Sequence, residues 1–501
     1  MYCSRRSSVS FRVSLLHSDS RKATKVRNNK VSVQDTTIPR HRQDQQTLIL
    51  LSLSLIMSYQ KLRSILLLIG LLPIQAWVPY QHANTLRTIR RTSPSDSTMA
   101  LNAQAGFGIS SKDVTIQAVS DAANEALEKC PNPTIAFISS TVKRDSESVR
   151  AEFVKHLPKG TQIHGITSSG AILTTGGANA GAVGCLLLSG EEGSFKTAYH
   201  PEDGAAAAKS LKARMPNPQA IYMSATPGAE EGVIEALAAE FPDVPVFGGT
   251  AADDELAGAW AVMSDEGVSG TGVSLVGIGE SVKFGASMIG PYTTTRKHAK
   301  ATKSEGRRVF EIDGKPAADW VFDWLGEEVR EQYENGGLVL PQTAQKPIGI
   351  KQPSAGGLGT KVASALGSAD YVTCHCAAFG GKEKYVDFFT PIPEGSELVV
   401  MESGDGPSTG YASALSDAFD VAKSNGSMDG NDPTAGILVF CGGMAIAVGD
   451  NLDSGLTSEG FASKFEGIPM MGMTCFGEQA HLPRAQKNAQ RNLSVGVVLF
   501  G

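Results

Sequence analysis

The sequence predicts a two-lobed α/β fold, built from repeated strand–helix–strand units whose mixed sheets are covered by helices. Three observations predict this class. A strand, a helix and a proline breaker follow one another three times, each such unit ends on a Gly-x-Thr tripeptide, and an apolar strand follows each tripeptide. With 501 residues, 41% of them apolar, the chain is long enough for two or three domains with substantial cores.

The three units share one order of elements. An apolar run of strand length comes first, a stretch with helical spacing comes second, and the tripeptide closes the unit. In chain order these parts lie at 134–138, 146–157 and Gly165–Thr167; at 220–223, 230–241 and Gly248–Thr250; and at 436–440, 457–465 and Gly472–Thr474. Strands joined through helices predict crossover connections over a sheet. The short return to a further strand, at 181–188, 272–278 and 494–500, predicts that part of each sheet is antiparallel.

Further elements flank the units. Residues 116–127 have the apolar spacing and alanine content of an amphipathic helix, and 411–423 predict another helix before the third unit. The stretches 335–354 and 356–367 are rich in loop residues and poor in apolar periodicity. They separate the first two units from the third, so we expect one domain over residues 108–335 and a second over 336–501.

The first hundred residues have the composition of a targeting sequence. Residues 1–56 are basic and Ser-rich, which is typical of a disordered segment or of a gene model extended too far upstream. Residues 57–76 resemble a signal peptide, because two basic residues precede a short apolar run and a small residue ends it. Residues 77–107 contain arginine, serine and threonine with few acids, as transit peptides do.

The junction Ala76-Trp77-Val78-Pro79 resembles the Ala-(Phe or Trp)-x-Pro motif of bipartite plastid presequences in algae with secondary plastids. We therefore expect a plastid protein, with secretion or an endomembrane location as the alternatives. The apolar run before this junction is too short to span a bilayer comfortably, so we expect no stable membrane insertion of the mature chain.

The charge distribution bears on the class of partner. Residues 1–100 hold 15 Lys and Arg and 4 Asp and Glu, which leaves 30 basic and 47 acidic residues, a net charge of −17, in 101–501. Such an acidic body argues against nucleic acid as the partner, because phosphate binding needs a basic surface. The seven cysteines are scattered through the chain and do not form the pattern of a disulfide scaffold.

Carboxylates follow two of the Gly-x-Thr turns, where open α/β sheets commonly bind ligands. Asp253 and Asp254 follow the second turn, and Gly477 and Glu478 follow the third. These acids suit a ligand ammonium group, while turn N–H groups suit a carboxylate. The predicted ligand site comprises Gly248, Gly249, Thr250, Asp253, Asp254, Cys441, Gly472, Thr474, Gly477 and Glu478. An Asx turn at the aspartates and a capping role for Glu478 are the alternatives.

Other reactive residues predict no catalytic or metal site. Cys441 follows a buried-looking strand, but His481 is its only plausible distant base, so a turn of small residues is the preferred interpretation. Alternation along a strand places Cys374 and Cys376 on one face and His375 on the other, which indicates core packing and not a metal site. The glycine pairs match neither the phosphate-binding nor the dinucleotide-binding pattern, so no cofactor is predicted.

The order of short motifs resembles the FIST family. Residues 133–329 are similar to its N-terminal half through His164–Gly170 and Val246–Asp254, and residues 369–501 are similar to its C-terminal half through Pro469–Glu478. Membership implies a small-molecule sensory domain of signal transduction, with amino acids as the proposed ligands. Met444 stands where many members have an arginine, which removes a carboxylate clamp.

We therefore expect a protein that binds a small polar metabolite, has no recognisable output module and is not an enzyme. Two alternatives stay open. One is a thiol-dependent enzyme that uses Cys441 or Cys475 with Glu478. The other is a protein-interaction scaffold.

Overall fold

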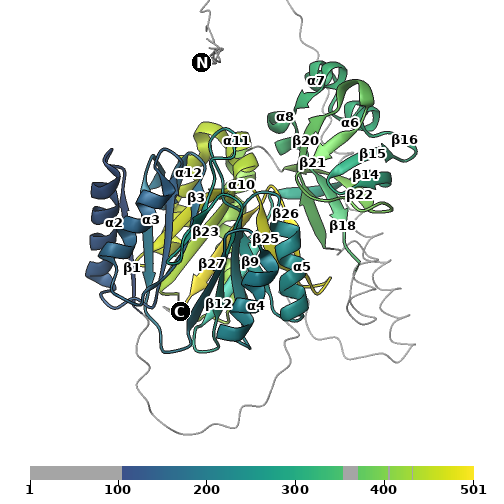
Figure 1. The fold of residues 1–501 in the computed structure, drawn as a ribbon. Coiled ribbons are helices and arrows are strands. Elements are labelled where there is room, and N and C mark those ends of the chain that lie inside the picture. The colour runs from purple at the N-terminus through teal and green to yellow at the C-terminus, as the bar shows by residue number, and fades with distance from the viewer. Residues whose placement is uncertain (1–103, 354–369, 404–406, 431–432) are drawn as a thin grey trace, which may run out of the picture. The chain divides into compact units, whose positions relative to one another are not determined.

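The computed structural model describes residues 104–353, 370–403, 407–430 and 433–501 (Figure 1). The predicted presequence lies outside the described residues. No helix within the described ranges is long and apolar enough to cross a membrane.

The repeat predicted from the sequence is confirmed, and each unit is larger than predicted. The first unit consists of β1 (Ala105–Ser110), α2 (Thr115–Lys129), β2 (Ile135–Thr141), α3 (Ser146–His156), β3 (Gln162–Ser168) and β6 (Val183–Leu188). The second consists of β7 (Phe195–His200), α4 (Gly204–Arg214), β8 (Ala220–Ala225), α5 (Glu230–Glu240), β9 (Val246–Gly249) and β12 (Val273–Ile278).

The third unit has the same strands but a more divided crossover. It consists of β13 (Phe284–Ile289), α10 (Pro407–Asn425), β23 (Ala435–Cys441), α11 (Gly442–Val448), η3 (Gly449–Asn451), α12 (Leu452–Leu456), α13 (Glu459–Ala462), η4 (Ser463–Phe465), β24 (Met470–Cys475) and β27 (Val495–Phe500). The sequence predicted a turn at Cys441–Met444, where the structure begins α11. Glycines are poor helix formers, but a Cβ at Gly443 would lie 2.8 Å from the His375 ring, so close packing excludes a better helix former there.

Strand order is the same in all three units: β1-β6-β2-β3, β7-β12-β8-β9 and β13-β27-β23-β24. In each unit, the strand that ends at the Gly-x-Thr turn is parallel to the strand before it, to which a helical crossover connects it. The pairs are β2 and β3, β8 and β9, and β23 and β24. The last strand returns antiparallel to the second, as β6 does beside β2. The predicted mixture of parallel and antiparallel pairing is therefore confirmed.

Each sheet is completed by a hairpin from a neighbouring unit. The three hairpins are β4 and β5 (Ala171–Thr174, Gly177–Ala180), β10 and β11 (Val262–Ser264, Val268–Ser269), and β25 and β26 (Glu478–Leu482, Lys487–Arg491). The hairpin of the first unit extends the third sheet beside β24, that of the second extends the first sheet beside β3, and that of the third extends the second sheet beside β9. The exchange is cyclic, so no unit has a complete sheet of its own.

The strands are apolar on both faces because each face is covered. In β2, Ile135 and Phe137 face a core shared by all three sheets, while Ala136 and Ile138 face α2 and α3. The outer face of the second sheet packs in the same way against α4 and α5, and that of the third against α10 to α13. Continuous apolar strands of this kind are typical of sheets buried on both sides.

A further lobe is inserted into the third unit, between β13 and α10 (Figure 1). Its described strands form one nine-stranded sheet with its own apolar core. Its elements are β14 (Tyr292–Glu305), β15 (Arg308–Ile312), β16 (Lys315–Pro316), α6 (Ala317–Leu325), η1 (Glu327–Val329), α7 (Arg330–Asn335), β17 (Gly337–Leu338), α8 (Leu340–Ala344), β18 (Ile348–Lys351), β19 (Tyr371–Cys374), β20 (Cys376–Phe379), η2 (Gly381–Glu383), β21 (Val386–Phe388) and β22 (Glu397–Ser403). The predicted domain boundary after residue 335 falls inside this lobe, where β15 pairs with β21.

Gly248 gives a test of how closely the repeated strands pack. A Cβ at this position would lie 1.8 Å from the carbonyl oxygen of Met223, a backbone atom that cannot move aside. We expect Gly248→Ala to lower the free energy of unfolding by about 2 kcal/mol or more. The control is Gly232→Ala in α5, where nothing lies within 4 Å of the added Cβ and the better helix former should stabilise. Urea unfolding measures both, and equal stabilities would contradict the packing described.

Candidate functional site

The three Gly-x-Thr turns meet where the units exchange their hairpins. The carbonyl oxygen of each threonine accepts a hydrogen bond from a backbone N–H of another unit. In each case the donor residue lies two positions after the Gly-x-Thr threonine of its own unit. The donors and acceptors are Ala252 to Thr167 at 3.0 Å, Ser169 to Thr474 at 3.1 Å and Phe476 to Thr250 at 3.3 Å. All three threonines are buried. We call this set of turns the central junction.

The glycines predicted for the site pack closely against the interior. A Cβ at Gly249 would lie 2.5 Å from the sulfur of Cys475, and one at Gly472 would lie 2.7 Å from Leu173. A Cβ at Gly477 would lie 1.9 Å from the side-chain nitrogen of Gln490. Added Cβ atoms at Gly249 and Gly472 would therefore displace packed side chains at the central junction, whereas at Gly477 the atom met is the end of the flexible Gln490 side chain.

The two aspartates are held by backbone N–H groups. The carboxylate of Asp253, only 1% exposed, accepts hydrogen bonds from Leu256, Ala257 and Ala259 at 2.7 to 2.9 Å. One oxygen of Asp254 accepts from the N–H of Gly170 at 2.7 Å, which links the second unit to the first. Asp253 thus stabilises the loop at 256–259 from a buried position, through N–H groups three to six residues ahead, whereas an Asx turn uses the N–H two residues ahead.

Glu478 lies at the central junction with no exposed surface. One carboxyl oxygen accepts hydrogen bonds from the N–H and the hydroxyl of Ser494 at 3.1 and 2.9 Å. The other oxygen has no nitrogen or hydroxyl donor among the described residues, and the Cys441 thiol is the neighbouring group that interacts with the carboxyl. Burial raises the pKa of Glu478 to about 8, because an ionised carboxylate is poorly solvated there. Arg491 is its register partner across β25 and β26, and the guanidinium of Arg491 donates to the carbonyl oxygen of Met288 and the hydroxyl of Thr373.

The thiols near Glu478 are poorly suited to nucleophilic chemistry. Cys441 and Cys475 are paired in register on β23 and β24, and each is at most 3% exposed. Burial, together with the neighbouring Glu478, raises the pKa of both thiols well above the ordinary value. A thiol must ionise to attack, so this environment favours an unreactive, packed cysteine.

The Cys374-His375-Cys376 run lies in the inserted lobe as its alternation predicts. Both thiols belong to the apolar core of that lobe, while the ring of His375 lies against Gly443 and its Nε2 is 3.1 Å from the carbonyl oxygen of Leu340. Burial lowers the pKa of His375 to about 4. The described residues contain no group of three or more side chains arranged to hold a metal ion.

A cavity of about 830 Å³ lies between α5, β26 and the inserted lobe. It is lined by Glu231, Ile234, Glu235, Ile350, Lys351, Gln352, Pro353, Val372, Thr390, Pro391, Pro393, Gly395, Ser396, Glu397, Lys487, Asn488, Ala489 and Gln490. Its volume is in the range of about 300–1,000 Å³ that is usual for small-molecule sites. Apolar side chains and charges of both signs line it together.

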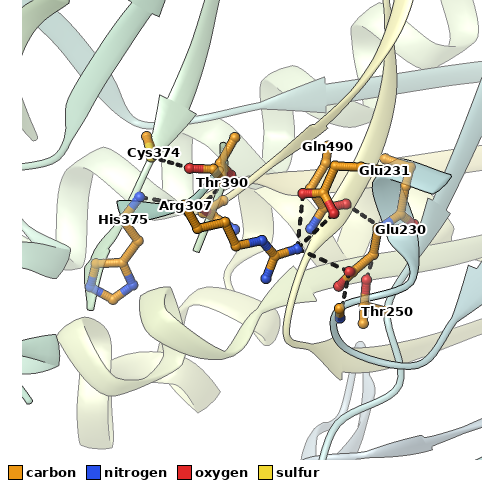
Figure 2. Close-up of polar contacts among 11 residues, drawn as sticks. Glu230, Glu231, Thr250, Arg307, Cys374, His375, Thr390 and Gln490 are labelled. Carbon is orange, nitrogen blue, oxygen red and sulfur yellow. Dashed lines mark hydrogen bonds and ion pairs between the residues drawn. The ribbon is translucent and has the colours of Figure 1, made fainter. Parts of the chain in front are cut away.

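One wall of the cavity is hydrogen-bonded to the central junction (Figure 2). The side-chain nitrogen of Gln479 donates to the side-chain oxygen of Gln490 at 2.6 Å and to the hydroxyl of Thr250 at 2.8 Å. Gln490 lines the cavity and is 5% exposed. Thr250, one of the predicted site residues, is thus connected to the cavity lining through the two hydrogen bonds of Gln479.

A second polar contact joins the inserted lobe to α5 near the cavity (Figure 2). The Arg307 guanidinium lies 3.1 Å from a carboxylate oxygen of Glu230 and 2.9 Å from one of Glu231. Glu230 is 2% exposed, and burial raises its pKa. Glu231 itself lines the cavity, so a ligand there would lie beside this ion pair.

Sequence reasoning missed the cavity because its walls come from three distant segments. Only β26 carried a local signal, since Lys487–Arg491 are mostly polar although the strands around them are apolar. A polar strand among apolar ones indicates an open edge or a wet surface.

The pKa of Glu478 predicts a pH dependence of stability. In the folded protein this acid stays protonated up to about pH 8, whereas in the unfolded chain it ionises near 4.5. Its contribution to stability is therefore complete below about pH 4.5 and is lost as the pH rises to about 8, by on the order of 1 kcal/mol per pH unit.

Glu478→Gln removes this titration, so the variant should gain stability relative to the natural chain between pH 5 and 8. Urea unfolding across this range measures the difference. The control is Glu192→Gln, the same substitution at an exposed position. If the difference between Glu478→Gln and the natural chain is constant across this range, the carboxyl is not protonated in the fold.

Comparison with known families finds a FIST N domain at residues 134–315 and a FIST C domain at residues 317–481. An uncharacterized protein of Methanocaldococcus jannaschii is 34% identical over 100 residues, which cover 20% of this chain and 19% of the archaeal one. The chain thus spans about a fifth of the length of this curated relative.

Proposed function

Since the chain carries both domains of the FIST family, whose domains are small-ligand-binding sensory domains in signal transduction, we propose that it senses an amino acid or a similar polar metabolite. The proposed site is the cavity between α5, β26 and the inserted lobe. Glu231 and Glu235 belong to the FIST N part of this site, and Lys351 and Glu397 belong to the FIST C part. A ligand held between the two domains would contact both.

The observation that carries this proposal is the pairing of opposite charges in one partly apolar cavity. Lys487 lies at one part of the lining with its side chain exposed, and partial desolvation lowers its pKa, so an anionic group beside it would stabilise its charged form. Glu231 and Glu235 supply negative charge from α5. An amino acid carries a carboxylate and an ammonium group, which suit these two sides of the cavity.

Two polar contacts connect residues of the cavity lining to other units of the fold. Gln490 is hydrogen-bonded through Gln479 to Thr250 of the central junction, and Glu231 shares Arg307 with Glu230. A ligand that changes the partners of Gln490 or Glu231 therefore acts on contacts that join separate units of the fold.

We expect Lys487→Ala to weaken the binding of a stabilising amino acid about 10- to 100-fold, as the loss of a charge-assisted hydrogen bond would. Thermal-shift screening of the full chain against the twenty amino acids identifies the ligand, and calorimetry then measures the affinity. The control is Lys382→Ala, an exposed lysine of the inserted lobe outside the cavity lining. A ligand that binds both variants equally well lies elsewhere, and the absence of any stabilising ligand would contradict the proposed function.

We further propose that residues 57–107 direct the chain to a plastid through the secretory route. The proposal rests on the signal-peptide-like stretch, the Ala76–Pro79 junction and the transit-peptide composition after it. A fluorescent protein fused behind residues 57–107 should accumulate in the plastid of a diatom cell. The variant Trp77→Ala should be retained outside the plastid stroma, whereas secretion of the unaltered fusion would refute this location.

A further inference from the structure

We infer that the cavity selects amino acids whose side chain carries a positive charge, and that Glu231 and Glu235 of α5 hold this charge. The inference rests on the proposed function, since it names the ligand class of the same site. It narrows the ligand from amino acids in general to basic ones, such as lysine and arginine.

The charges that line the cavity do not balance. The lining contains three glutamates, Glu231, Glu235 and Glu397, and two lysines, Lys351 and Lys487. Lys351 and Glu397 are already paired with each other at 2.9 Å. A zwitterionic amino acid adds no net charge and leaves the negative excess in place, whereas a ligand with one further positive group removes it.

Arg307 does not compensate Glu231 fully, because this one guanidinium serves two carboxylates. Its Nη2 lies 3.1 Å from an oxygen of Glu230 and 2.9 Å from both oxygens of Glu231. Glu230 is 2% exposed, whereas Glu231 is 29% exposed and lines the cavity. A positive ligand group beside Glu231 would supply the second cation that this cluster lacks.

Glu235 lies one helical turn after Glu231 on the same side of α5, and its side chain is exposed. Among the described residues, the ion pairs of α5 are those of Glu230 and Glu231 with Arg307, and Glu235 has none. Side chains four residues apart on a helix have Cβ atoms about 6 Å apart, and like charges at this spacing repel. An ammonium or guanidinium group between Glu231 and Glu235 would turn this repulsion into attraction.

Apolar lining residues suit the stem of such a side chain. Ile234 of α5 and, on the inserted lobe, Ile350 and Val372 contribute apolar surface to the same cavity as the two glutamates. The methylene groups of a lysine or arginine side chain can lie on apolar surface while the charged end stays in a polar environment. The volume of about 830 Å³ leaves room for these longer side chains.

Gln490 supplies an independent sign that the cavity takes a polar ligand. It lines the cavity and is only 5% exposed. Its amide oxygen accepts from Gln479 at 2.6 Å, and its amide nitrogen makes no hydrogen bond with the described residues. A donor so deeply buried favours an acceptor beside it, which the carboxylate of an amino acid would provide.

Calorimetry with the full chain tests the inference with three probes. These are lysine, norleucine, which is lysine without its side-chain ammonium group, and glutamate. We expect lysine to bind about 10-fold more tightly than norleucine, as two partly exposed ion pairs would give, and glutamate to bind more weakly than either. Added salt should reduce the preference for lysine, because it screens exposed charges.

The variant Glu235→Gln should reduce the preference for lysine over norleucine about threefold and leave the affinity for norleucine unchanged. A general loss of structure would weaken both probes, so the ratio of the two affinities reports the charge itself. The matched control is Glu240→Gln, which removes the same charge from the end of the same helix, outside the cavity lining. It should keep the full preference.

The failures of the two proposals are distinguishable. If norleucine binds as tightly as lysine, and this binding depends on Lys487, the proposed function stands and the inference of a basic ligand is overturned. Tighter binding of glutamate than of lysine, or an unchanged preference in Glu235→Gln, also overturns it. If no amino acid binds, the inference and the proposed function fail together.

Discussion

The cyclic set of backbone hydrogen bonds at the central junction is the constraint on which the rest of the structure depends. The carbonyl groups of Thr167, Thr250 and Thr474 are buried, and a buried carbonyl without a donor is costly. Each finds its donor in another unit, just where the chain leaves one sheet and joins the next. Since every sheet is completed by a neighbour's hairpin, the three units and their shared core are stable only together.

This constraint also explains the unusual environment of Glu478. The residue opens β25, the first strand that the third unit contributes to the second sheet, and it faces inward at the point of exchange. Ser494 satisfies one of its oxygens, and protonation lowers the cost of burying the other. Gln479, the next residue along the strand, points to the other face and reaches Thr250 and Gln490. Alternation along one strand thus places a buried acid on one side and a link to the cavity on the other.

The elements that were predicted correctly are those whose signal is local. The spacing of apolar residues predicted α2, α3, α5 and the body of α10, and apolar runs predicted β2, β8 and β23. The helix predicted at 457–465 is in fact α13 and η4, preceded by α11 and α12, and the apolar side chains of these short helices join one core with α10 and β23. For the candidate site, the sequence drew attention to Thr250 and Glu478 but not to Lys487 or Gln490. Lys487 and Gln490 line the cavity only because the inserted lobe lies beside them. That lobe is far from them along the chain, so no periodic pattern in the sequence indicates the contact.

The sequence by itself determined the threefold recurrence of strand, helix and Gly-x-Thr turn, because burial on a strand or helix imposes a period that can be read along the chain. Only the tertiary structure decided that the recurrent turns are an interior junction, that their hairpins are exchanged, and that the cavity lies beside β26. The physical reason is that these features arise from contacts between segments far apart in the chain, such as Asn492 with Thr373 and Phe476 with Thr250. No local pattern encodes which distant backbone group will supply a missing hydrogen bond.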